Sequence, residues 1–206
     1  MIDRLNTLCD RAFEALLDAY HAALPDAYHP RNNGGILFPC YRSGKPRISE
    51  QELRQQFIEE VRRTYPSWYY SVETPTESCY DFQHGVEATE KGRSARFDLT
   101  LYDEQRHPIA FIEFKAHGRT TQPNYEKDFL KLVQTNGVVC RLFVQLFEGF
   151  DDTTLNNLVE KKLGPSFNAV PTAREKIACR FYTLKPYNGE HHLTEIITKE
   201  LATQCN

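Results

Sequence analysis

The sequence predicts an α/β fold in which a mixed central sheet is flanked by helices. Two apolar, strand-like runs, residues 96–102 and 109–115, flank a polar turn and predict a β-hairpin. An amphipathic helical pattern and one further strand precede this hairpin, and a helix followed by a strongly apolar strand comes after it. In chain order the predicted core is therefore helix–strand–strand–strand–helix–strand, or αβββαβ.

Apolar residues recur at helical spacing over residues 2–24 and predict an N-terminal amphipathic helix that ends at Pro25. Residues 30–46 are rich in turn-forming residues. At 206 residues the chain has the length of one domain with room for an appended segment. We therefore expect residues 1–47 to form a helix and a lead-in loop, and residues 48–206 to form the main domain.

The main domain begins with a clear helix signal, because Ser49 and Glu52 have the spacing of a capping box. Tyr65 and Pro66 end this helix. The remaining patterns predict a strand at 68–73, an extended segment at 78–86, the hairpin, a helix at 124–135, a strand at 141–147, a helix at 151–163, a strand at 176–184 and a closing helix at 192–203.

The hairpin carries charges that its pairing brings together. If Tyr102 lies opposite Ile109, then Asp98 lies opposite Glu113. Side chains alternate between the faces of a strand, so Glu113 and Lys115 share one face, and the register adds Asp98 to it. Two carboxylates and an ammonium group in one small volume are costly unless a cation or a phosphate joins them.

This pattern resembles that of the PD-(D/E)xK nuclease superfamily, with Asp98 as the first acid and Glu113-Phe114-Lys115 as the E-x-K element. Phe97 stands where the name-giving motif has proline. The resemblance covers residues 49–146 and implies a restriction-endonuclease-like core, similar to that of Holliday-junction resolvases. It also implies a metal-dependent nuclease that hydrolyses phosphodiester bonds of nucleic acid, with DNA expected.

In the resembled enzymes two carboxylates bind Mg²⁺, for which Mn²⁺ substitutes. The resemblance thus implies Asp98 and Glu113 as metal ligands, with the backbone carbonyl of Phe114 as a third oxygen. It implies that Lys115 assists the attacking water or stabilises charge on the phosphate.

A further catalytic acid is expected on the helix that starts after Ser49, and three residues are candidates. Glu50 lies three residues before Leu53 and seven before Phe57, so it points toward the buried stripe, and we favour it. Glu52 already has a role in the capping box. Glu60 lies near the edge of the stripe.

Two other groups leave alternatives open. Lys127 and Lys131 share a helix face and either reach phosphates or lie on a solvated face. The run Trp68-Tyr69-Tyr70 either stacks on bases or packs in the core, and the core is favoured. His117, which shares a face with Glu113 and Lys115, either contacts substrate or lies near solvent at a strand end, and the second is favoured.

Composition restricts the partners and the compartment. The formal net charge of −3 argues against a protein that coats nucleic acid over a broad surface. Six scattered cysteines without a C-x-x-C pair, and no signal-peptide pattern, predict free thiols in the cytoplasm. No apolar run reaches the roughly 20 residues that cross a bilayer, so no membrane is expected.

Two alternatives to a nuclease follow from the same residues. The first is a catalytically inactive nuclease-fold module that binds nucleic acid or a protein partner, which the mild acidity favours. The second is a homodimer or larger complex formed through the N-terminal helix.

Overall fold

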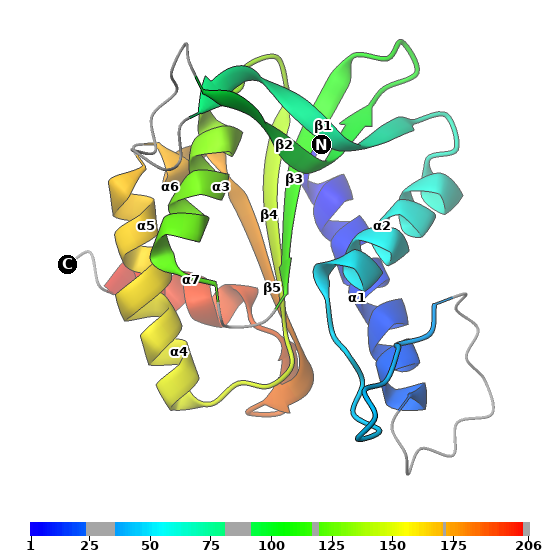
Figure 1. The fold of residues 1–206 in the computed structure, drawn as a ribbon, viewed down its shortest axis with the longest axis vertical. Coiled ribbons are helices and arrows are strands. Elements are labelled where there is room, and N and C mark those ends of the chain that lie inside the picture. Colours follow the sequence, from blue (N-terminus) through cyan, green and yellow to red (C-terminus); the bar gives the residue numbers. More distant parts are fainter. Residues whose placement is uncertain (24–35, 81–91, 117–119, 171, 204–206) are drawn as a thin grey trace.

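A computed structural model describes residues 1–23, 36–80, 92–116, 120–170 and 172–203. Its centre is a six-stranded sheet in which the strands lie side by side in chain order, β1 to β6. The β3–β4 and β4–β5 pairs are parallel and the other neighbours are antiparallel. Helices cover both faces of the sheet (Figure 1), which confirms the predicted α/β class with a mixed central sheet.

The strands are β1 (Tyr69–Tyr80), β2 (Arg93–Tyr102), β3 (Pro108–Ala116), β4 (Cys140–Phe147), β5 (Ala178–Tyr187) and β6 (Glu190–His192). The helices are α1 (Ile2–Ala22), α2 (Glu50–Thr64), α3 (Gln122–Gln134), α4 (Asp152–Leu158), the π-helix η1 (Val159–Leu163), α5 (Gly164–Ala169), α6 (Ala173–Lys176) and α7 (Thr194–Thr203). From α2 to β4 the order of elements is the predicted one.

Several boundaries differ from the prediction, and three of these differences change the type or the extent of an element. Strand β1 continues to Tyr80 and so absorbs the start of the extended segment predicted at 78–86, while residues 81–86 lie outside the described part. The helix predicted at 151–163 changes into the π-helix η1 at Val159. The closing helix starts at Thr194, because residues 190–192 pair with β5 as the short strand β6.

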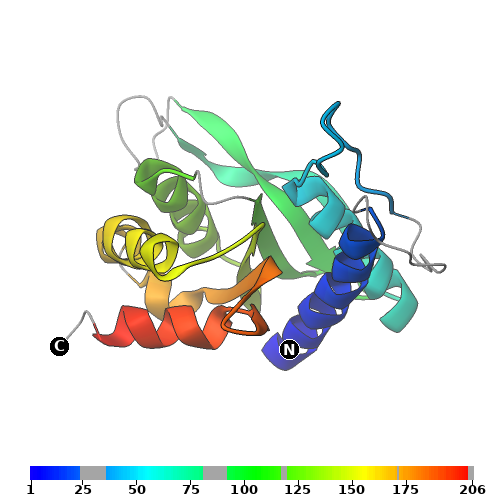
Figure 2. The ribbon, with the colours of Figure 1, turned by 90° about the horizontal axis from the view of Figure 1, so that it is seen from below.

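The sheet separates two hydrophobic clusters. Helices α1 and α2 pack on one face, and α3 to α7 with η1 pack on the other (Figures 1 and 2). The apolar stripe of α1, which includes Leu5 and Phe13, is buried in the same cluster as α2 and the sheet. Because this stripe is occupied within the chain, the predicted partner interface through the N-terminal helix has no structural support.

The β2–β3 hairpin forms with one change of register. Leu99 pairs with Ile112 and Leu101 with Ala110, as predicted. Near the turn, however, Tyr102 pairs with Pro108 instead of Ile109, because the register shifts there. Toward the other end the pairing stops at Leu99, one residue before Asp98.

The described cysteines, Cys9, Cys40, Cys79, Cys140 and Cys179, are free thiols. Within the described ranges, none of the helices combines the length and the apolar character that crossing a bilayer requires.

Candidate functional site

Asp98 lies where β2 stops pairing with β3. Its Oδ2 accepts a hydrogen bond of 2.7 Å from the backbone N–H of Phe114, in the place of a ladder partner. Because the N–H and C=O groups of one strand residue face the same neighbouring strand, the carbonyl of Phe114 lies on the Asp98 side of β3. The end of the hairpin thus combines a carboxylate with an adjacent backbone oxygen.

Glu113 is completely buried on the face of β3 that α3 covers. Its Oε1 accepts a 2.7 Å hydrogen bond from Lys131 Nζ of α3. The other oxygen, Oε2, is buried without a hydrogen-bond partner among the described residues. An orphaned carboxylate oxygen in the interior is costly, and such a group calls for an explanation.

Lys115 lies on the same face, as the alternation along β3 predicts. Its Nζ is 2.9 Å from Asp128 Oδ2 of α3, and the lysine side chain is 21% exposed. Asp128 also pairs with Lys131, at 3.0 Å between Oδ1 and Nζ. One helix, α3, therefore supplies a counter-charge to both the acid and the lysine of the E-x-K element.

Lys131 fills the centre of this network. Its ammonium group lies within 3.0 Å of Glu113 and Asp128 and donates to the carbonyl oxygen of Arg96 at 2.9 Å. An ammonium group has three N–H donors, and each of them has one of these three oxygens as its acceptor. The solvated-face interpretation of Lys131 is wrong, because its side chain is only 5% exposed.

Of the three candidate helix acids, Glu50 interacts electrostatically with Lys115 and Asp98 of this cluster. Burial raises its pKa, Lys115 opposes the shift, and Asp98 adds to it. Glu52 is engaged by its capping box and by Arg47. Glu60 pairs with Arg63. The favoured residue, Glu50, therefore interacts with the charged groups of the site.

Burial is the main cause of the raised pKa values of the two central acids. Burial raises the pKa of Asp98, although the Phe114 N–H and Lys115 oppose this effect. Burial also raises the pKa of Glu113 well above its usual range, and Asp128 adds to this rise. For Lys115, burial lowers the pKa, but Asp128 and Glu113 outweigh it and the net shift is upward. Lys115 is therefore a protonated cation at neutral pH.

The net charge of the cluster fits a divalent cation. When all groups are ionised, the four carboxylates of Asp98, Glu113, Asp128 and Glu50 face the two ammonium groups of Lys115 and Lys131, which leaves two negative charges. No three His, Cys, Asp or Glu side chains form a metal-binding group among the residues that the structure describes. The predicted ligand set differs from such a group, since it consists of two carboxylates and a backbone carbonyl.

Sequence reasoning named Lys131 as a candidate but missed Asp128, the acid that α3 supplies to the site. Asp128 follows Tyr125 by three residues and precedes Leu132 by four, so it lies on the buried stripe of α3. A charged residue on such a stripe is a signal that the sequence offers. The hydroxyl group of Tyr125 donates a 2.8 Å hydrogen bond to Oε1 of the buried Gln145 of β4. Gln145 is the β4 neighbour of Lys115.

Glu73 of β1 was also missed, and its carboxylate forms ion pairs with two arginines. Its neighbours Val72 and Thr74 pair with Leu99 and Phe97, so Glu73 lies alongside Asp98. Its carboxylate pairs with Arg54 at 3.3 Å and with Arg96 at 3.8 Å. The backbone of Glu73 has a φ of 53°, in the left-handed region, where strain is stored at functional sites.

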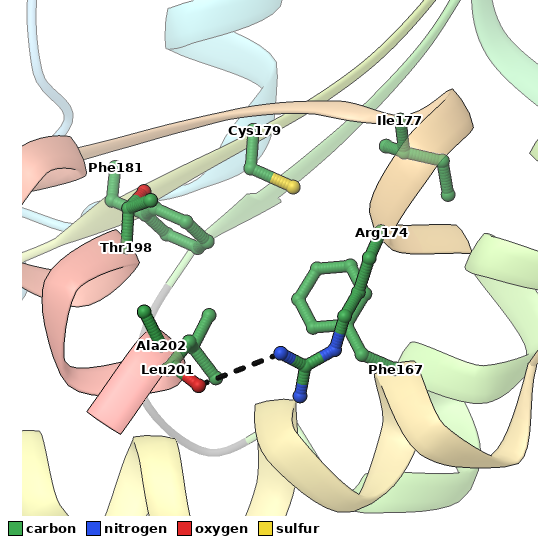
Figure 3. A pocket seen from close by; sticks show the side chains of 8 residues that line it. All are labelled: Phe167, Arg174, Ile177, Cys179, Phe181, Thr198, Leu201 and Ala202. Atoms are coloured by element: carbon green, nitrogen blue, oxygen red, sulfur yellow. Dashed lines mark hydrogen bonds between the residues drawn. The ribbon is translucent and has the colours of Figure 1, made fainter. Parts of the chain in front are cut away.

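A separate cavity of about 250 Å³ lies between β5, α5, α6 and α7 (Figure 3). Phe167, Ile177 and Phe181 line it with apolar surface. Figure 3 shows Arg174 at its side, where the guanidinium donates to the carbonyl of Leu201. Burial raises the pKa of Cys179 in this cavity to about 12, which makes its thiol a poor nucleophile. The cavity has none of the acid–lysine chemistry of the hairpin site.

Comparison with known proteins adds no assignment. The chain matches no protein-family model, and neither the curated proteins nor the solved structures contain a match. The functional argument therefore depends on the geometry and electrostatics of the site.

The raised pKa of Asp98 predicts that its charge destabilises the metal-free protein. A carboxyl whose folded pKa is raised contributes stability that is fully present below its unfolded pKa, near 3.8, and is lost as the pH rises through the folded value. Asp98→Asn keeps an oxygen for the Phe114 N–H and removes the charge. We expect this variant to have a melting temperature a few degrees higher at pH 7 without metal, and unchanged near pH 4.

Thermal unfolding monitored by circular dichroism in EDTA measures this difference. Asp18→Asn, at an exposed position of α1, is the matched control and should leave the melting temperature unchanged at both pH values. A metal-free Asp98→Asn protein that melts below the wild type at pH 7 would show that the Asp98 charge is well compensated.

Proposed function

We propose that the chain is a metal-dependent nuclease that hydrolyses phosphodiester bonds of DNA, with the PD-(D/E)xK arrangement as its catalytic site. One observation carries this proposal. Asp98, Glu113 and Lys115 lie together at the end of the β2–β3 pairing, with a buried Glu113 oxygen that has no partner among the described residues and a Glu113 pKa that burial raises. The order of elements from α2 to β4 supports a restriction-endonuclease-like core.

The residues present fit a hard divalent cation. Asp98, Glu113 and the Phe114 carbonyl would hold Mg²⁺ or Mn²⁺, since these ions prefer oxygen ligands and take one or two protein carboxylates. Glu113 Oε2 lacks another partner in the described structure. When bound, such an ion neutralises charge on the phosphate and acidifies a water molecule.

Lys115 acts as a cation in this proposal. Because its pKa is raised by Asp128 and Glu113 against the effect of burial, it keeps its proton and does not act as a general base. Its partial exposure lets it face a substrate phosphate. There it stabilises the negative charge that develops on the phosphate oxygens.

Residues of α3 and α2 position this chemistry. Asp128 orients Lys115 by the 2.9 Å ion pair, and Lys131 holds Glu113 in place. Glu50 adds a carboxylate that interacts electrostatically with Lys115 and Asp98, and in this proposal it orients the attacking water molecule. Such fixed dipoles and charges cost no reorganisation at the moment of reaction.

A cleavage assay with Mn²⁺ tests the proposal. Linear, circular, single-stranded and branched DNA are incubated with wild-type protein and with Lys115→Ala. We expect metal-dependent cutting of at least one substrate by the wild type, and a loss of about 100-fold or more in the variant. Cutting by both proteins at equal rates, or by neither, would contradict the proposal.

A second function is favoured by one observation. The ion pairs from α3 already satisfy Lys115 and one oxygen of Glu113, as they would in a module that has kept the fold and lost catalysis. Such a module would bind nucleic acid without cutting it. Binding of the same DNA substrates without metal-dependent cleavage would identify it.

A further inference from the structure

The end of α2, the connection to β1 and the start of β1 form an exposed aromatic and basic pocket away from the hairpin site. Arg62, Pro66, Trp68, Tyr69 and Tyr70 line this pocket, which has a volume of about 240 Å³ and is called the aromatic pocket below. Tyr69 is 49% exposed and Tyr70 is 41% exposed. The favoured core role is therefore wrong for these two tyrosines, whose rings reach solvent at the start of the edge strand β1.

The aromatic pocket is held in shape by ring contacts. Trp68 stacks on Tyr65 with ring centroids 4.2 Å apart and an interplanar angle of 13°. The guanidinium of Arg4, in α1, lies 5.8 Å from the centroid of the Tyr65 ring. Rings fixed in this way lose little freedom when a ligand binds, which favours affinity.

Cations surround the aromatic pocket. Arg62 is an exposed residue of the last turn of α2 and lines the pocket itself. Arg106 comes from the β2–β3 turn, and its guanidinium lies 5.3 Å from the ring centroid of Tyr69. Arg106 has a φ of 65°, so the turn adopts a backbone conformation unfavourable for an arginine. Figure 1 shows the start of β1 and the tip of the β2–β3 hairpin at the same corner of the molecule.

The position of the pocket relative to the hairpin site suits one ligand. Tyr69 pairs with Tyr102, which lies four residues from Asp98 along β2, a span of about 13 Å at 3.3 Å per residue. A strand with the 3.4 Å spacing of duplex DNA covers this span with about four nucleotides, and a more extended single strand covers it with fewer. Arg96 lies on the side of Asp98 away from the aromatic pocket. Both Arg96 and Arg54 form ion pairs with Glu73 of β1.

We propose that the aromatic pocket binds unpaired bases of single-stranded DNA, a few nucleotides from the phosphate that the hairpin site would cleave. This inference rests on the proposed function for the substrate class, and it adds that the substrate has a single-stranded part. Aromatic faces bind bases by stacking, and arginines bind the backbone. A duplex hides the faces of its bases, whereas an unpaired strand presents them.

The only tryptophan of the chain provides a direct probe, because Trp68 lines the pocket. Wild-type protein in EDTA, which prevents metal-dependent cutting, is titrated with a mixed-sequence DNA oligonucleotide of ten nucleotides. We expect Trp68 fluorescence to be quenched as the single strand binds. We expect the affinity for the blunt duplex of the same sequence to be at least ten-fold weaker.

Two substitutions locate the binding. Tyr69→Ala and Tyr70→Ala are each expected to weaken single-strand binding by about ten-fold, whereas Tyr69→Phe keeps the ring and should bind nearly as the wild type does. Tyr41→Ala is the matched control, since Tyr41 is also a solvent-exposed tyrosine, 56% exposed, and lies outside the pocket. Circular dichroism checks that every variant is folded.

Each outcome decides between the two proposals. Single-strand binding that depends on Tyr69 and Tyr70 supports the aromatic pocket even if the wild type fails to cleave, and in that case only the nuclease proposal falls. Equal affinity for single strand and duplex, unchanged affinity in both alanine variants, or absence of quenching would overturn the pocket proposal and leave the cleavage test untouched. Tighter binding of the RNA oligonucleotide of the same sequence would overturn the assignment to DNA.

Discussion

Replacing Glu113 with glutamine is expected to reduce metal-dependent DNA cleavage by about 10³-fold or more. The substitution keeps the size of the side chain and an oxygen for the 2.7 Å hydrogen bond from Lys131, but it removes the charge. Losing a carboxylate ligand forfeits several kcal/mol of stabilisation, and each 1.4 kcal/mol is about ten-fold in rate. Initial rates with Mn²⁺ and a labelled substrate measure the effect.

Glu160→Gln provides the matched control for this change. Glu160 is an exposed residue of η1, an element that does not belong to the β2–β3 hairpin. Its substitution should leave the cleavage rate within two-fold of that of the wild type. If Glu113→Gln cleaves like the control, then Glu113 has no part in the chemistry and the buried acid is structural.

Replacing Lys131 with methionine is expected to destabilise the fold by about 3–5 kcal/mol. The methionine side chain fills a similar volume, but Glu113 and Asp128 then lose the ammonium group that lies 2.7 and 3.0 Å away. Removing one member of a buried ion network leaves uncompensated charges in the interior. Urea unfolding in EDTA gives the free energy of unfolding of each protein.

Lys127→Met, one turn earlier on α3, is the control, and we expect it to cost less than about 1 kcal/mol because Lys127 is only half-buried. The account also predicts that Mg²⁺ restores part of the stability of Lys131→Met, because a cation at the site would replace the lost positive charge. A loss below 1 kcal/mol for Lys131→Met would show that the network contributes little to the fold.

The hairpin site could be predicted from the sequence because its geometry is local. Strand alternation places Glu113 and Lys115 on one face, and a short polar turn fixes the register that brings Asp98 to them. The bulge near Tyr102 did not change this outcome, since residues 99–101 keep the predicted register. The local periodicity of the sequence was thus sufficient to predict the order of elements and to identify the central acids.

The contribution of α3 could not be predicted in the same way. Lys131 and Asp128 reach Glu113 and Lys115 across the packing of a helix on a sheet, which depends on the angle and the height of the helix. Lys131 in particular has the sequence context of an exposed residue. Its burial results from tertiary packing. The cost of burying its ammonium group is offset because three oxygens interact with its N–H groups.

The aromatic pocket shows a second limit of periodicity. Tyr69 and Tyr70 have the residue types of a buried strand, but β1 is the edge strand of the sheet and its first residues face solvent. Whether a strand lies at an edge depends on the sheet order, which the residues of that strand do not contain.

Isothermal titration of Mn²⁺ into wild-type protein and into Asp98→Asn tests the central claim most directly. Asp98→Asn keeps the hydrogen bond from the Phe114 N–H, so it changes the charge of the site and little else. The account predicts a metal site in the wild type that the variant loses, together with a metal-dependent rise in melting temperature in the wild type alone. Absence of binding in the wild type, or equal affinity in both proteins, would contradict it.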